Sequence, residues 1–230
     1  MTLVPLLAAL SLAAGPSSPR SAQALVERSV EAYGGRSALA RFPAMVEEGV
    51  VTSAMRGRGK VTRIFERPRR LRVSIAYGGE RGELRVLDRE RGWRDGEEVS
   101  GAPPYLAMVL QAARLDLPLV LLEGKQGLVD EGPVERAGAK LRAVSVSLGD
   151  GLGLRAEIDP ASGEVRRVVT RLAGPGGAVE FATEFGDFRK VSGVLVPFRE
   201  TNFAQGQRTG ETVLSSVELL REAPAGAFRP

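Results

Sequence analysis

The chain has 230 residues, 43% of them apolar, and its 32 basic and 28 acidic residues give a formal charge of +4. It contains no cysteine and no histidine, which excludes disulfides, thiolate nucleophiles, Cys/His zinc sites and any catalytic triad with an imidazole base. Aromatic residues make up only 5% of the chain, so we expect no stacking on nucleic acid bases. This length fits one domain with a sizeable core.

The N-terminal segment resembles an export signal. The apolar run Leu3 to Ala14 is too short to cross a bilayer as a helix but suits the core of a signal peptide. Small residues in Ala22-Gln23-Ala24 predict cleavage after residue 24, with 1–24 as signal peptide and 25–230 as one mature domain. Gly15 to Pro19 offers an earlier site, and an N-terminal core helix or a disordered tail is the alternative.

Helical spacing of apolar residues predicts an amphipathic helix over Ala22 to Ala32, which Gly34-Gly35 terminates. Arg36 to Arg41 can add a second short turn. From Val46 onward the apolar period changes to two, which indicates strands. Later predicted strands lie around 84–86, 92–94, 144–148, 154–158, 165–172, 179–188, 194–203 and 209–219.

The alternation is interrupted once, over Ala102 to Gly124. Pro103-Pro104 suits a helix start and Pro118 must kink or divide the helical stretch, so this region predicts two short helices. Its most apolar part, Leu115 to Leu122, is either a core helix or a movable lid with Gly101 and Gly124 as hinges.

These elements predict an α+β fold: a single curved antiparallel sheet of about ten strands, an unclosed half-barrel wrapping an N-terminal helix and a mid-chain helical pair. Twist accumulates across so many strands, so the sheet must curl. The helices can cover only part of its concave apolar side. The remainder is a candidate binding cavity.

A series of short motifs occurs in an order that resembles the LolA-like periplasmic lipoprotein and lipid carriers. The resemblance covers roughly Leu25 to Leu220, and its motifs are Tyr33-Gly34-Gly35, Arg67-Pro68, Leu71-Arg72-Val73, Gly92-Trp93-Arg94-Asp95-Gly96, Ile158-Asp159-Pro160, Ser162-Gly163 and Gly193-Val194-Leu195-Val196-Pro197. It implies a soluble, exported, periplasmic carrier that binds acyl chains of lipoproteins or lipids in an apolar groove. Envelope membrane proteins that deliver or receive cargo are the implied partners, and we expect a monomer without cofactor or nucleic acid.

A sensor or accessory domain that binds a protein by strand addition at an exposed sheet edge is the alternative function. We expect no enzyme, because the carboxylate pairs Glu47/Glu48 and Glu97/Glu98 are sequence neighbours that point to opposite faces of a strand. Nor does the sequence predict a metal site.

The sequence offers two sets of candidate contact residues. The expected groove lining, for which plain core packing is the alternative, comprises Leu71, Val73, Ile75, Trp93, Met108, Leu119, Leu122, Phe181 and Phe185. The expected contacts to anionic head groups or a membrane surface are Arg67, Arg69, Arg70 and Arg72. The alternative for these arginines is a solvated outer face on which they pair with the acidic residues of 80–98.

Overall fold

The structure, a computed structural model, describes residues 19–79, 82–124, 127–149, 151–174 and 177–230. The helices are α1 (Pro19–Ala32), α2 (Gly35–Arg41), α3 (Pro103–Leu115) and α4 (Leu117–Glu123). The strands are β1 (Ala44–Ser53), β2 (Gly57–Glu66), β3 (Arg70–Tyr77), β4 (Glu83–Asp88), β5 (Arg91–Arg94), β6 (Glu97–Glu98), β7 (Val129–Arg136), β8 (Ala139–Gly149), β9 (Leu152–Ile158), β10 (Val165–Gly174), β11 (Gly177–Val191), β12 (Val194–Ala204) and β13 (Gln207–Leu220).

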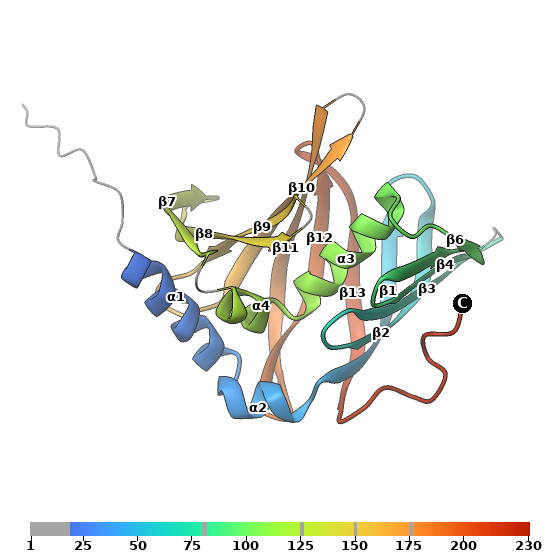
Figure 1. Cartoon of the computed structure of the whole chain (residues 1–230), viewed down its shortest axis with the longest axis horizontal. Coiled ribbons are helices and arrows are strands. Elements are labelled where there is room, and N and C mark those ends of the chain that lie inside the picture. The colour runs from blue at the N-terminus through green and yellow to red at the C-terminus, as the bar shows by residue number, and fades with distance from the viewer. Residues whose placement is uncertain (1–18, 80–81, 125–126, 150, 175–176) are drawn as a thin grey trace, which may run out of the picture.

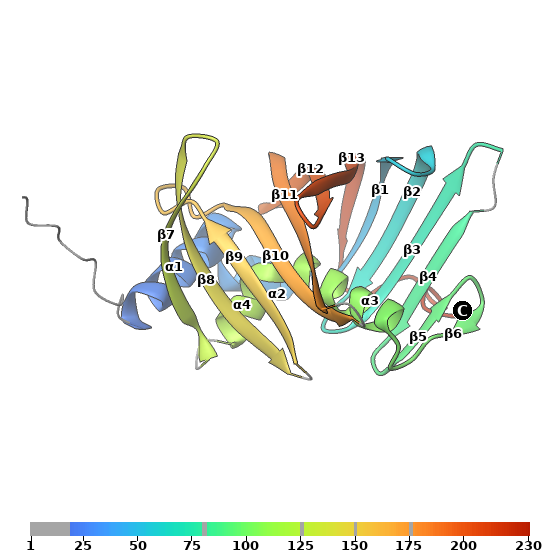
Figure 2. The same cartoon turned by 90° about the horizontal axis from the view of Figure 1, so that it is seen from above.

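All of these strands belong to one antiparallel sheet in the order β6-β5-β4-β3-β2-β1-β13-β12-β11-β10-β9-β8-β7. Two meanders, β1–β6 and β7–β13, are thus joined by the pairing of β1 with β13. The sheet is strongly bent and open, and the helices lie in its hollow (Figures 1 and 2). The predicted α+β half-barrel is therefore confirmed.

The strand number is thirteen in the described part of the chain, and the prediction of about ten was too low. The main omission is β7, whose sequence VDEGPVER is polar on both faces and mostly exposed. An edge strand of this kind has no alternation to detect, and its glycine and proline are typical of a turn. The two-residue β6 is too short to leave a pattern.

The first helix begins at Pro19 rather than at the predicted Ala22. It therefore runs through the predicted cleavage site, and Ala22 is fully buried. The Ser21 hydroxyl also donates a hydrogen bond to the carboxylate of Asp130 on β7. Residues 1–18 of the predicted signal peptide lie outside the described residues. Cleavage after residue 24 remains a prediction, and it would remove these contacts.

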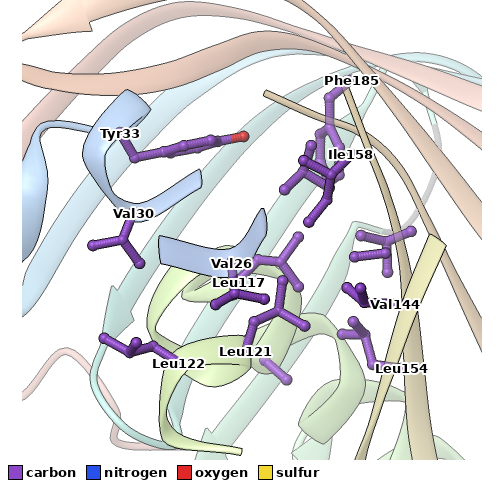
Figure 3. Close-up of a cluster of buried hydrophobic side chains, with 14 of the residues drawn as sticks. Val26, Val30, Tyr33, Leu117, Leu121, Leu122, Val144, Leu154, Ile158 and Phe185 are labelled. Atoms are coloured by element: carbon purple, nitrogen blue, oxygen red, sulfur yellow. The ribbon is translucent and has the colours of Figure 1, made fainter. Parts of the chain in front are cut away.

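The hydrophobic core has two parts. In the first, α1 and α4 pack on β8–β12, and Val26, Leu117 and Leu121 meet Leu154 and Ile158 of the sheet (Figure 3). In the second, α3 packs on β3–β5 and β10, and its buried residues include Met108, Val109 and Leu110. The chain bends by 94° between α3 and α4. No single helix within the described residues is long and apolar enough to span a membrane, although α3 and α4 together pass by length and composition.

Close backbone contacts fix α1 and α2 against the sheet. Gly34 has φ +114°, and a Cβ built there would lie 2.5 Å from the carbonyl oxygen of Gly193 in the β11–β12 turn. The amide of Leu195 donates a hydrogen bond to the Tyr33 carbonyl at 3.2 Å. Glycine at position 34 is therefore required both by its left-handed backbone and by the lack of space.

Candidate binding site in the concave face

A row with three charged residues crosses the concave face. The strand register places Glu47, Arg63, Val73 and Arg85 side by side on β1, β2, β3 and β4. The next inward-facing row on one side is entirely apolar and consists of Met45, Phe65, Leu71 and Leu87. On the other side, Val61 pairs with Ile75, and Ile75 pairs with Glu83. The charged row therefore lies directly beside an apolar one.

Part of this row belongs to a buried ion network, which we call the arginine–glutamate network: Glu47, Arg63, Arg114 and Glu200. The Nε of Arg63 donates to Glu47 at 2.6 Å, and its two Nη atoms donate to the two carboxylate oxygens of Glu200 at 2.8 Å each. From α3, Arg114 donates to Glu200 at 3.3 Å and to the hydroxyl of Thr183 at 2.6 Å. The three groups Glu47, Arg63 and Glu200 are 3% exposed or less.

The pKa values of the two carboxylates in the network are shifted in opposite directions. Burial alone would raise the pKa of Glu200, but the charges of Arg63 and Arg114 outweigh it and lower the pKa to about 2. Burial raises the pKa of Glu47; attraction by Arg63 offsets this in part, and repulsion by Glu200 adds to it. Since Glu200 is held ionised by two arginines, it is the anionic centre of the network.

Two hollows meet at this network. The polar cavity lies between α3 and the sheet, has a volume of about 310 Å³ and is lined by residues that include Val61, Arg63, Ile75, Arg85, Gln111, Arg114, Leu172, Phe181, Thr183, Glu200 and Asn202. The apolar pocket is narrower, about 80 Å³, and lies among α2, the α3–α4 junction and the starts of β1 and β12. It is lined by residues that include Leu39, Phe42, Met45, Phe65, Leu115, Phe185, Leu195 and Leu219.

Arg114 and Glu200 line both hollows. The concave face therefore holds one amphipathic site with a wide polar part and a narrow apolar part. No group of three or more Asp, Glu, His or Cys side chains in the described ranges is arranged to hold a metal ion.

No known protein family and no curated protein matches the sequence. Solved structures do match, at low identity and nearly full length. A LolA superfamily protein from Nitrosomonas europaea superposes with a TM-score of 0.57 at 9% identity, covering 91% of this chain and 97% of that one. The chain has a LolA-like fold.

Two further structures share the LolA-like fold with this chain. A domain from Vibrio parahaemolyticus, named for outer-membrane lipoprotein sorting, has a TM-score of 0.50 and 10% identity and covers 92% of this chain and 97% of its own. A DUF1329 family protein from Desulfovibrio piger has a TM-score of 0.52 and 9% identity, with 88% and 94% covered. At such identities the comparison supports the fold alone.

The LolA-like hollow contains some of the predicted groove residues. Val73, Ile75 and Phe181 line the polar cavity, and Phe185 lines the apolar pocket.

The other predicted groove residues lie elsewhere. Leu71, Met108 and Leu122 are buried core residues, and Leu119 is half-buried at the edge of the first core. Gly92 faces Met108 in the hollow, so Trp93 points to the outer face, where the guanidinium of Arg91 lies 4.8 Å from its ring centre. Since Leu122 is buried and Leu119 is half-buried, α4 packs as a core helix.

The four predicted head-group arginines do not converge. Arg67 lines the apolar pocket, where it pairs with Asp116 at 2.7 Å and donates to the carbonyl of Leu39 at 3.0 Å. Arg70 pairs with Asp88 at 3.1 Å and lies over the ring of Phe228.

Arg69 lies 3.7 Å from Glu90, and Arg72 donates to backbone carbonyls of the C-terminal segment, with that of Arg229 at 2.8 Å. In the part of the chain that the structure describes, the pairing with acidic residues of 80–98, considered as the alternative for these arginines, is present at Arg69 and Arg70 but not at Arg72 or Arg67.

The residues that sequence reasoning missed are the members of the arginine–glutamate network and Arg85. A signal was present: Arg63 stands between Val61 and Phe65, both inward-facing, in a strand of period two. An arginine in the apolar phase of such a strand needs a buried partner. The partners themselves could not be read, since Glu200 is 137 positions away.

Proposed function

We propose that this protein is a periplasmic carrier that binds the acyl chain of a lipid or lipoprotein in the hollow of its sheet. The observation that carries the proposal is that the apolar pocket and the polar cavity adjoin, since Arg114 and Glu200 line both. An amphiphile needs a site of both kinds. The LolA-like fold, shared with a domain named for lipoprotein sorting, supports the same function.

The driving force is the burial of alkyl surface, about 0.8 kcal/mol for each methylene removed from water. At about 80 Å³ the apolar pocket is too small to take a long chain without expanding. Its wall can move to make room, because Met45, Leu195 and Leu219 are only partly buried and methionine adapts readily to irregular space. We therefore expect cargo to enter by displacement of these side chains.

The experiment is lipid analysis of the protein purified from its native compartment. Organic extracts are analysed by mass spectrometry for the wild type, for Met45→Trp, which fills the apolar pocket, and for Val213→Trp on β13, which lines neither hollow. We expect stoichiometric lipid or acylated peptide with the wild type and the Val213 variant, and depletion with the Met45 variant. Equal lipid in all three would contradict the proposed site.

A clean extract, together with failure of the wild type to bind a fluorescent fatty acid, would favour the sensor or accessory function instead. That function needs an accessible edge for strand addition. The longer edge strand, β7, contains Pro133, a register shift between Asp130 and Gly132, and several charged residues. These features oppose pairing with another strand, so the structure favours the carrier.

A further inference from the structure

The polar cavity carries an excess of positive charge. Arg63, Arg85 and Arg114 line it, against the single carboxylate of Glu200. Glu47 neutralises part of this charge from the far side of Arg63, at 2.6 Å. At the rim, Glu83 approaches Arg85 but also lies 3.8 Å from Arg56 and 3.9 Å from Arg94.

The three arginines differ in how completely they are bonded. All three nitrogen positions of Arg63 donate to carboxylates. By contrast, the buried Nε atoms of Arg85 and Arg114 have no hydrogen-bond partner among the described residues, although Glu83 lies 3.0 Å from the former in poor orientation. Arg85 otherwise donates to a neutral amide, that of Gln111, at 3.1 Å. These two guanidinium groups therefore retain capacity for an anion.

The electrostatics of the two groups agree with this geometry. Burial lowers the pKa of Arg85 and of Arg114. The charges of Glu83 and Glu200, respectively, offset this in part, and the neighbouring charge of Arg63 lowers both pKa values further. A buried cation in this situation is stabilised by any additional negative charge. Arginine is suited to that role, since its planar donors bind carboxylate and phosphate in a bidentate manner.

We propose that Arg85 and Arg114 bind the anionic head group, a carboxylate or a phosphate, of a single-chain amphiphile whose alkyl chain enters the apolar pocket. This inference rests on the proposed carrier function and specifies its substrate class and orientation. Arg114 lines both hollows, so a head group beside it lies next to the apolar pocket. Phe65 and Met45, in the row next to the charged residues on that side, line the pocket that would receive the chain.

The test is isothermal titration of the delipidated full-length protein with hexadecanoic acid, hexadecyl phosphate and hexadecanol at neutral pH. A hydrogen bond to an ionised group is stronger than one between neutral groups, so we expect one or both anions to bind at least about tenfold more tightly than the alcohol. The acid and phosphate arms separate the two sources of negative charge. Binding of the alcohol as tightly as both anions would overturn the head-group inference and leave the carrier function standing.

Failure of all three ligands to bind would overturn the carrier function together with the inference. The variant Arg85→Met should lose the preference for anions and keep its affinity for the alcohol, whereas Arg85→Lys should keep part of the preference. The matched control is Arg167→Met, because Arg167 also has a buried Nε without a partner but pairs with Glu184 on the outer side of the sheet. A preference that survives in Arg85→Met would exclude Arg85 as a ligand.

Discussion

The substitution Glu200→Gln tests the arginine–glutamate network directly. It keeps the shape of the side chain but removes the negative charge that receives two hydrogen bonds from Arg63 at 2.8 Å and an ion pair from Arg114 at 3.3 Å. The new amide group also turns a donor toward these donors. Removal of one partner from a buried ion pair costs about 3–5 kcal/mol, because the remaining charge cannot reach water. We expect a loss of this size in the free energy of unfolding.

The measurements are urea and thermal unfolding followed by circular dichroism. For a protein of this length, 1 kcal/mol corresponds to about 2–4 °C in Tm, so we expect Tm to fall by about 10 °C. The control Glu184→Gln removes an exposed carboxylate that lies 3.7 Å from Arg167, and such pairs contribute about 0–1 kcal/mol. A loss below about 1 kcal/mol for Glu200→Gln, with an unchanged m-value, would refute the reasoning.

Three further outcomes are expected. The Glu200 pKa of about 2 lies below its ordinary 4.5, so the ionised group stabilises the fold above pH 4.5, and this contribution is lost as the pH falls towards 2. Glu200→Gln should flatten this part of the curve of stability against pH, and parallel curves for the two proteins would contradict the prediction. Gly34→Ala should cost at least about 1–2 kcal/mol in urea unfolding because of its positive φ and the nearby Gly193 carbonyl. Gly57→Ala, also at positive φ (+73°) but in open space, should cost less, and equal losses would show that contact with Gly193 is unimportant. Asp116→Asn should loosen the α3–α4 junction, because Arg67 then loses its charged partner, and amide hydrogens in α4 should exchange faster. Unchanged exchange would show that the Arg67–Asp116 pair does not stabilise this junction.

The sheet could be predicted wherever one face of a strand is apolar and the other polar. The run Leu71, Val73, Ile75 and Tyr77 shows this, and all four residues are buried. The division of the mid-chain helices could be predicted from Pro118. By contrast, β7 gave no signal because water reaches most of both its faces.

The site was harder to predict than the fold, for a physical reason. Groove and core residues have the same chemistry, and only packing separates Ile75, which lines the cavity, from Leu71, which is fully buried. The polar residues of the site are hard to predict for another reason. Their partners come from distant segments, as with Arg114 and Glu200, so no local sequence pattern connects them.

The position of the network at the junction of the two meanders has a kinetic consequence. Glu47 and Arg63 come from the first meander, Glu200 from the second, and Arg114 from the helical connection between them. These four side chains can meet only after both meanders have docked. Interactions absent from the folding transition state act mainly on the rate at which the native state is lost. The network should therefore prolong the lifetime of the folded protein while leaving its rate of folding almost unchanged.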